Sequence, residues 1–195
     1  NFNYFDKENK KNIFNIINKK KNYDFNGKFF NANNLIEKLI NSNDEKKTQY
    51  LRNKFKIEIN VDKVQLDNEF TVNSFKGDLS LVNDEIINAN LSAYFSNNEN
   101  LKFTINSNSK EKTTTLFSEK AKPFVKRYKF IKGFDEGQLD YYSVKNNNKS
   151  ISTLKIYDFK LKEVPALTKL LTLASLQGIA DVLSGEGIRF NEFEM

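Results

Sequence analysis

The chain has 195 residues, with 31 Lys and Arg against 25 Asp and Glu and a formal net charge of +6. Hydrophobic residues make up 38% and include 18 Phe and 8 Tyr, which is too apolar and too aromatic for a disordered protein. The lack of Cys and His excludes thiol catalysis and thiolate metal sites and removes the commonest acid–base group. The length suits one domain, or a piece of a larger one, with a core of its own.

Residues 1–45 predict a strand followed by a short helix. The strand corresponds to Tyr23–Phe29. The helix follows Asn34, a favourable capping residue, and Glu37 lies three residues on, as in a capping box. Its apolar stripe is formed by Leu35, Ile36, Leu39 and Ile40.

Period-two alternation dominates residues 46–164. The clearest case is Phe55–Val61, in which every second residue is apolar and the residues between are Lys, Glu and Asn. The same rhythm returns near Phe70, Leu79, Leu91, Leu101, Leu154 and Phe159. Turn-like residues separate the segments at 61–63, 67–69, 96–100 and 145–149. The pattern predicts an antiparallel meander with one apolar and one solvated face, and with a short helix near 119–129.

A kinked apolar helix is predicted for residues 165–184, followed by the start of a further strand in 185–195. Pro165 suits a first helical turn and Gly185 suits a helix end. The apolar face turns partway along, with Gly178 between the two halves. One interpretation is a buried core helix with a glycine kink, and the other is a helix lying over an apolar surface that is otherwise uncovered.

Basic residues gather in three modest clusters, at Lys7–Lys11, Lys19–Lys21 and Lys122–Lys132. Such clusters can neutralise nucleic-acid phosphates or anionic lipid headgroups. Acidic residues are scattered among most of them, so we expect a solvated basic surface. The Phe residues fall in phase with aliphatic residues, which counts against a stacking platform for single-stranded nucleic acid. Nucleic acid is therefore not expected as a partner.

No constellation typical of a catalytic site is found in the sequence. The closest approaches are two acidic pairs, Asp135 with Glu136 and Asp181 with Glu186, at positions where solvation or capping explains them. The glycines form neither a phosphate-binding loop nor a dinucleotide motif, and no calcium loop is present. We therefore predict that the protein is not an enzyme and has no catalytic residues, no metal site and no cofactor.

A specific pattern lies in residues 151–194, ISTLKIYDFKLKEVPALTKLLTLASLQGIADVLSGEGIRFNEFE. A strand is followed by a Pro-x-Leu entry at Pro165–Leu167, by an apolar helix containing Leu173–Gly178, and by Leu-Ser-Gly-Glu-Gly-Ile-x-Phe at Leu183–Phe190. This segment resembles the C-terminal region of the AsmA-like family, the bacterial relatives of bridge-like lipid transfer proteins.

The resemblance continues upstream with weaker motifs. Residues 115–143 are similar to the family's strand, short helix and return strand, although Lys122 replaces a common Gly and residues 134–136 widen a loop. Residues 23–40 resemble the family's strand, turn and helix more faintly.

The resemblance implies a long β-sheet curved into an open apolar trough. Such a trough carries phospholipid or other acyl chains between the inner and outer membranes of a Gram-negative cell. It also implies a periplasmic location and an N-terminal inner-membrane anchor. Because the chain starts without Met, we expect a fragment of one larger trough domain that lacks this anchor.

The resemblance and the alternation together identify candidate residues of the trough. The candidate lining residues are Phe55, Ile57, Ile59, Val61, Leu91, Ala93, Phe95, Leu101, Phe103, Ile105, Leu154 and Ile156. The candidate residues of the covering helix are Leu167, Leu170, Leu171, Ala174, Leu176, Ile179 and Leu183, and the structural turn glycines are Gly178, Gly185 and Gly187.

Two other functions stay open at this point. A closed β-sandwich acting as a scaffold or adhesion module would bury its apolar faces in protein and hold no lipid. A basic nucleic-acid-binding module would bind DNA or RNA with a steep salt dependence. No oligomeric state is predicted.

Overall fold

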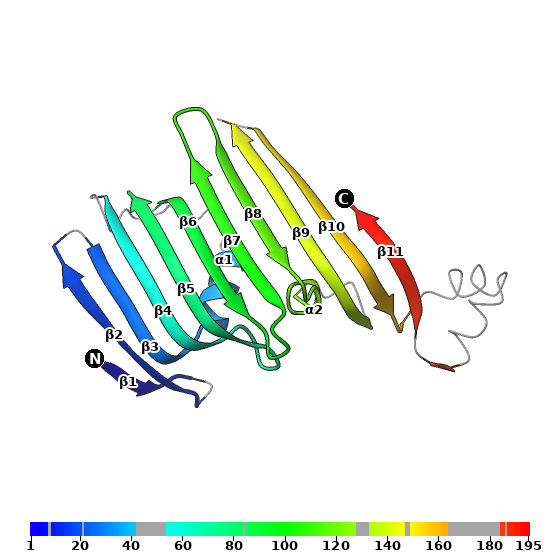
Figure 1. Cartoon of the computed structure of the whole chain (residues 1–195), viewed down its shortest axis with the longest axis horizontal. Helices are drawn as coiled ribbons and strands as arrows, with labels where there is room; N and C mark the ends of the chain where they lie inside the picture. Colours follow the sequence, from blue (N-terminus) through cyan, green and yellow to red (C-terminus); the bar gives the residue numbers. More distant parts are fainter. Residues whose placement is uncertain are drawn as a thin grey trace.

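Eleven strands form one open sheet in which each strand pairs with its neighbours in the chain (Figure 1). The computed structural model describes residues 1–7, 9–20, 22–41, 54–83, 85–127, 133–146, 149–163, 184–185 and 187–195, and the count of elements refers to these. The strands are β1 (Phe2–Phe5), β2 (Lys11–Lys19), β3 (Asn22–Asn31), β4 (Phe55–Gln65), β5 (Thr71–Val82), β6 (Glu85–Tyr94), β7 (Asn100–Ser107), β8 (Lys112–Ser118), β9 (Phe134–Asn146), β10 (Lys149–Leu161) and β11 (Ile188–Glu194). The helices are α1 (Asn33–Asn41) and α2 (Lys122–Val125). The prediction of a mainly β protein, with a curved open meander and short helices, is confirmed.

One pair of neighbouring strands departs from the predicted antiparallel arrangement. β3 and β4 run parallel, with Tyr23 opposite Ile57 and Phe25 opposite Ile59. Parallel neighbours need a crossover of a dozen or more residues. The connection that contains α1 supplies this length between Asn31 and Phe55. The prediction of a single strand in residues 1–45 is also wrong, because β1 and β2 precede β3.

The turn predicted at 61–63 lies inside β4, which continues to Gln65. The alternation breaks here because Val61 and Val64, three residues apart, are both buried in the same cluster. The partner strand β5 accommodates this break at Ser74, whose φ of 52° lies in the left-handed region. The strand therefore continues through the break, and only the alternation of side chains between its two faces changes there.

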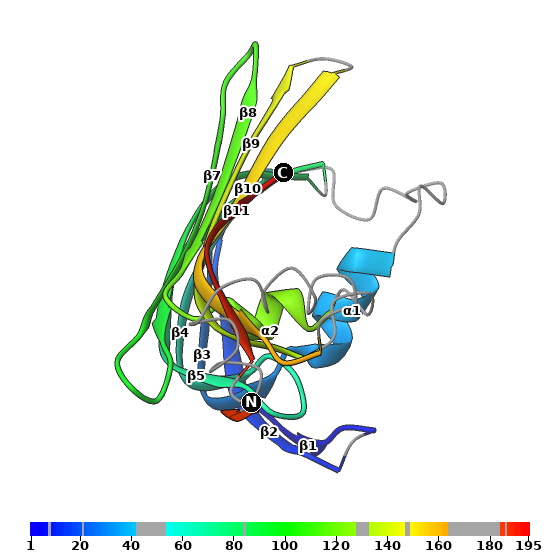
Figure 2. The same ribbon diagram turned by 90° about the vertical axis from the view of Figure 1, so that its right-hand side faces the viewer.

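Both helices lie on the concave side of the curved sheet (Figure 2). One cluster of buried residues consists of Ala32, Val61, Val64, Leu66, Val72, Ala93, Phe95 and Leu101, and a second consists of Ala121, Val125, Phe134, Leu139, Ile156 and Phe159. Ile36 of α1 and Phe124 of α2 pack against the first cluster. The core therefore lies between the helices and the sheet, at the end where β4, β6, β8 and β10 finish.

A buried asparagine network determines where α1 begins. Asn12 is 1% exposed, and its Oδ1 accepts a hydrogen bond of 2.7 Å from the backbone N of Asn31. The Asn31 Oδ1 in turn accepts a bond of 3.0 Å from the backbone N of Asn33. Asp6 Oδ2 accepts from the amide groups of both Asn12 and Asn31, at 3.0 and 2.8 Å. The helix accordingly starts at Asn33, close to the cap predicted at Asn34.

The predicted helix at 165–184 falls mainly on residues 164–183, which lie outside the described residues. All its candidate covering residues and Gly178 belong to this segment. No helix in the described part of the chain is long and apolar enough to cross a membrane.

Candidate functional site

A row of nine residues in register crosses nine strands on the face that carries the core clusters, with apolar or aromatic side chains at every position except Gly77. The pairing register places its members directly opposite one another, so that they point to the same face. This middle row consists of Ile16, Phe25, Ile59, Gly77, Leu91, Phe103, Leu116, Tyr141 and Leu154. Eight strand spacings of about 4.8 Å make the row about 38 Å long. It contains no charged residue, and the Tyr141 hydroxyl is its one polar side-chain group.

The row next to the middle row is closed by the helices. It contains Ala93, Leu101, Ser118, Leu139 and Ile156 in register, each 8% exposed or less. By contrast, the members of the middle row from Phe25 to Leu154 are only half-buried, and Ile16 is 44% exposed. The helices therefore complete a core at one end of the strands, and beyond it an apolar strip stays partly open on the concave side.

The opposite face of the same strands is polar. In β4 it carries Lys56, Glu58 and Asn60, and Lys56 pairs with Glu58 at 3.4 Å. In β7 it carries Thr104, whose hydroxyl bonds that of Thr115 at 2.7 Å. The sheet is thus mainly apolar on its concave face and mainly polar on its convex face.

The strand register brings the candidate lining residues of the sequence analysis to the apolar face. Six of them are half-buried, namely Phe55, Ile57, Ile59, Leu91, Phe103 and Leu154. The other six are buried, namely Val61, Ala93, Phe95, Leu101, Ile105 and Ile156. The buried set is packed by protein, so the half-buried set is the better candidate for contact with a ligand. Contact with lipid itself stays a prediction.

Sequence reasoning missed several members of the apolar face. Phe25 and Leu116 belong to the middle row, but Leu116 follows a run of three Thr residues that weakens the apolar signal of β8. Phe14 extends the face toward β1, with ring centroids 4.7 Å from Phe25 and 5.0 Å from Phe2. The run of β-branched Thr residues before Leu116 and Phe117, which favours a strand, was the signal that could have identified Leu116.

Two of the three predicted turn glycines are described. Gly185 and Gly187 have φ values of 71° and 89°, which favour glycine. A Cβ on Gly187 would lie 2.8 Å from the Leu161 carbonyl oxygen, whereas one on Gly185 would meet nothing within 4 Å. Gly187 therefore allows the chain to approach the end of β10 closely before β11 begins.

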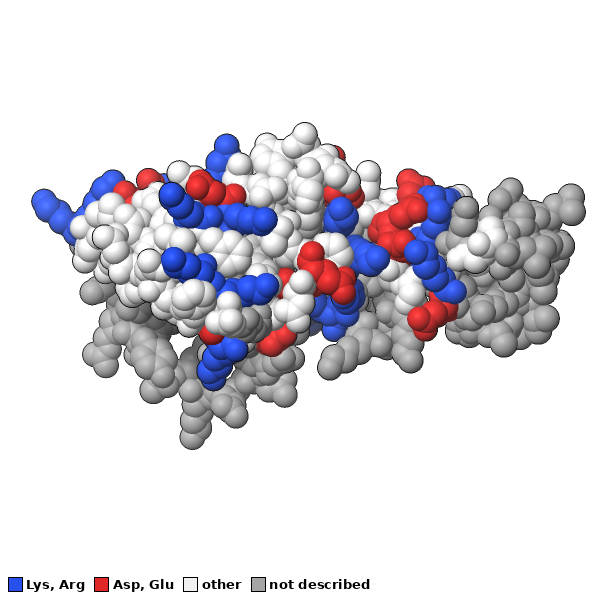
Figure 3. Space-filling model, turned by 90° about the horizontal axis from the view of Figure 1, so that it is seen from below, with Lys and Arg blue, Asp and Glu red and all other residues white. Residues whose placement is uncertain are grey.

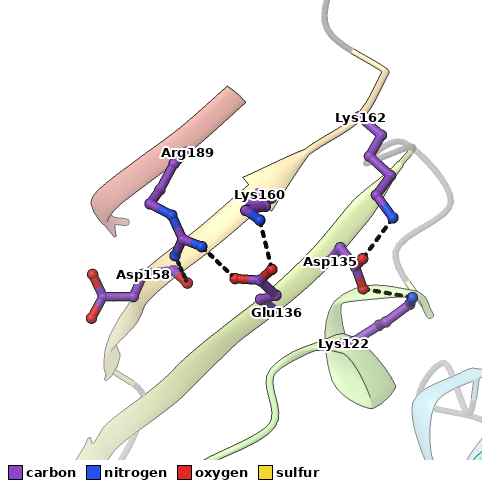
Figure 4. Close-up of polar contacts among 7 residues, drawn as sticks. All are labelled: Lys122, Asp135, Glu136, Asp158, Lys160, Lys162 and Arg189. Atoms are coloured by element: carbon purple, nitrogen blue, oxygen red, sulfur yellow. Dashed lines mark hydrogen bonds and ion pairs between the residues drawn. The ribbon is translucent and has the colours of Figure 1, made fainter. Parts of the chain in front are cut away.

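The acidic pair Asp135 and Glu136 is held in ion pairs (Figure 4). Asp135 lies 2.8 Å from both Lys122 and Lys162, and hydrogen bonds from these two ammonium groups lower the pKa of its carboxyl. Glu136 pairs with Lys160 at 2.9 Å and with Arg189 at 2.7 Å, and the hydrogen bond from Lys160 is the main cause that lowers its pKa. Both carboxylates are thus kept ionised, which does not suit the general acid that glycoside hydrolysis needs.

Acidic and basic side chains are interspersed at the helix-covered end of the sheet, as seen from below (Figure 3). Lys120 pairs with Glu99 at 2.7 Å, and Lys126 pairs with Glu69. Much of the predicted cluster at Lys122–Lys132 is therefore neutralised locally, although residues 128–132 lie outside the described residues. This pairing fits the prediction of a solvated surface rather than a phosphate-binding one.

The described residues contain no group of three or more acidic, His or Cys side chains placed to hold a metal ion. Comparison of the chain with protein-family models, with curated proteins and with solved structures found no match. The sheet itself and the resemblance found in the sequence are therefore the two indications of function.

Proposed function

We propose that the apolar concave face binds the acyl chains of a phospholipid or a similar lipid. The observation that carries the proposal is the middle row, which crosses nine strands without a charge and stays half-buried although the neighbouring row is fully packed. Covering this row with an apolar ligand is favourable, because each Å² of apolar surface removed from water contributes about 25 cal/mol to binding.

The affinity of such a face comes from area rather than from a single polar contact. Each buried methylene contributes about 0.8 kcal/mol, so about fifteen methylenes with half of their surface covered would gain ~6 kcal/mol. This arrangement also suits passage of lipid along the row, because successive strands offer similar side chains with no strong local site.

The resemblance to the AsmA-like family extends the proposal. The chain would be a segment of a periplasmic protein anchored in the inner membrane, and it would carry phospholipid toward the outer membrane without catalysing a reaction. The open sheet with its one-sided apolar row supports this function over a scaffold, since a scaffold needs no partly exposed apolar strip.

The test is native mass spectrometry with lipid extraction, applied to the purified chain and to two variants of β7. Phe103→Asp places a carboxylate in the middle row, whereas Asn106→Asp places one on the exposed polar face three residues away. We expect co-purifying acyl lipid in the unchanged chain and in Asn106→Asp, and a more than tenfold loss in Phe103→Asp because an unpaired carboxylate is costly against hydrocarbon.

Folding of each variant is checked by circular dichroism, and Ile57→Asp serves as a second variant if Phe103→Asp does not fold. A folded, unchanged chain that holds no lipid would refute the proposal and favour a scaffold. Equal lipid retention in the two β7 variants would refute the assignment of the face.

A further inference from the structure

The turn that joins β7 to β8 and the adjacent ends of β9 and β10 carry a strongly basic group of residues, called here the basic tip. Residues 108–112 read Asn-Ser-Lys-Glu-Lys and residues 145–149 read Lys-Asn-Asn-Asn-Lys, so that four lysines accompany one glutamate. Lys112 of β8 lies directly opposite Lys145 of β9. The described residues of the tip therefore carry a net positive charge.

The lysines of this basic tip differ from those at the helix-covered end. Lys110, Lys145 and Lys149 form no ion pair among the described residues, whereas Lys122, Lys160 and Lys162 each do. Lys145 and Lys149 are exposed at the ends of their strands. Their charge is therefore available to a partner.

Large apolar side chains lie near these strand ends on the convex face, which Lys149 shares, whereas Lys145 faces the concave side in phase with Ser143. Ile151 is 75% exposed and pairs across the sheet with Val144, and Tyr142 is 51% exposed. None of the three belongs to either core cluster. An exposed aliphatic group and an aromatic one, with lysines at the neighbouring strand ends, is the composition of a surface that enters the boundary between lipid headgroups and acyl chains.

The tip is placed where it can reach a flat surface. The two hairpins lie side by side, because β8 pairs with β9, and both extend beyond the ends of β4, β5 and β6 (Figures 1 and 2). A bilayer could therefore meet the tip without meeting the rest of the sheet.

We infer that the tip formed by residues 108–112, 142–146 and 149–151 docks on the surface of an anionic lipid bilayer. The lysines attract the headgroups and Ile151 enters the interface beneath them. A nucleic acid would also attract the lysines, but it gives no role to an exposed isoleucine beside them. The inference goes beyond lipid carriage, since it uses the strand ends and the convex face rather than the middle row.

The experiment uses Ile151→Trp as a reporter, because the chain contains no Trp. Its fluorescence is followed on titration with vesicles of phosphatidylglycerol mixed equally with phosphatidylcholine, and with vesicles of phosphatidylcholine alone. Asn90→Trp, on the exposed polar face of β6, is the control for general effects of vesicles. We expect a blue shift for Ile151→Trp with the anionic vesicles only, and none for Asn90→Trp.

The role of charge is tested by adding two further substitutions to the Ile151→Trp reporter. Lys145→Gln with Lys149→Gln should weaken binding about 30-fold, since each lysine near an anionic surface contributes about fivefold. Lys76→Gln with Lys102→Gln removes the same charge from exposed positions of β5 and β7 away from the tip and should leave binding within about twofold.

The absence of a blue shift would overturn the inference, as would equal losses in the two lysine pairs. Binding of a single-stranded oligonucleotide that depends on Lys145 and Lys149, without vesicle binding, would overturn it in favour of a polyanion site. Loss of co-purifying lipid through Phe103→Asp leaves the tip intact, so the result is distinguishable from failure of the proposed function.

Discussion

Three glycines that share a positive φ differ in what surrounds them, and the structure predicts a steep order in the cost of changing each to Ala. Gly77 in the middle row has φ of 144°, and a Cβ there would lie 1.9 Å from the Asn90 carbonyl oxygen. Gly187 would place its Cβ 2.8 Å from the Leu161 oxygen, and Gly185 has no atom within 4 Å. Gly185 and Gly187, with φ of 71° and 89°, differ mainly in the close approach of the backbone, whereas at Gly77 the φ of 144° adds backbone strain to that approach.

The expected costs follow from these distances. At Gly185 only the backbone conformation opposes Ala, by about 1–2 kcal/mol, partly offset by about 0.4–1 kcal/mol from the unfolded chain. At Gly187 the Leu161 carbonyl must also move by a few tenths of an ångström, for a total of about 2 kcal/mol. At Gly77 the Asn90 carbonyl must move by at least 1.1 Å, the difference between the 3.0 Å limit and 1.9 Å. This would separate β5 from β6 and cost about 4 kcal/mol or more.

Thermal unfolding followed by far-ultraviolet circular dichroism measures the order. For a chain of this length 1 kcal/mol corresponds to about 2–4 °C in Tm, so Gly185→Ala should lower Tm by a few degrees. Gly77→Ala should lower it by about 10 °C or prevent folding. Equal losses at Gly77 and Gly185 would refute the described contact between β5 and β6.

Two further predictions concern the helix-covered end. Asp135→Asn should lower Tm at neutral pH by a few degrees. Lys122 and Lys162 lower the pKa of this carboxyl. The ionised carboxylate therefore contributes to stability above pH 3.8, near its pKa in the unfolded chain, and this contribution is lost as the pH falls below that value. The gap between Asp135→Asn and the unchanged chain should therefore narrow below about pH 4, whereas a gap independent of pH would contradict the ion pair. Ile156→Ala, at a residue 2% exposed, should cost about 2–5 kcal/mol, and Leu154→Ala on the same face about half as much because Leu154 is only half-buried. If urea unfolding gave equal losses of unfolding free energy for the two variants, the helices would not bury the row of Ile156 more completely than the middle row.

Alternation predicted most of the strands because each has one apolar and one polar face. In Phe55–Val61 the facing of every residue followed from period two alone. The parallel pairing of β3 with β4 did not follow, since pattern determines which face a residue occupies but not the direction of its neighbour. The extent of β4 was also missed, because Asp62 and Lys63 read as a turn.

The candidate site was predictable to a similar degree. Individual lining residues were identified from the alternation within each segment. Their alignment in one row depends on the register of nine strands, and the pattern of a single segment does not specify that register. The basic tip was missed because Lys145 and Lys112 are 33 residues apart in sequence and meet only through the pairing of β8 with β9.

At two places in the sheet, apolar residues three positions apart in one strand point to the same face. These interruptions of the alternation explain how one sheet carries both a closed core and an open apolar strip. Ile156 and Phe159 both lie in the second cluster although they are three residues apart, and Asp158 between them has φ of 50°. The rings of Phe134 and Phe190 stack on Phe159 from either side, with centroids 5.3 Å away in each case. Val61 and Val64 repeat the arrangement opposite Ser74 at the other side of the sheet.

At both places the left-handed residue allows an extra apolar side chain to face inward, and these side chains fill the space beneath the helices. One side of the strip packs against this core, through Phe25, Ile59, Leu116, Tyr141 and Leu154, and strict alternation resumes along the strip. Because this packing still leaves the members from Phe25 to Leu154 only half-buried, an acyl chain lying along the middle row, as proposed, would cover apolar surface that the core does not.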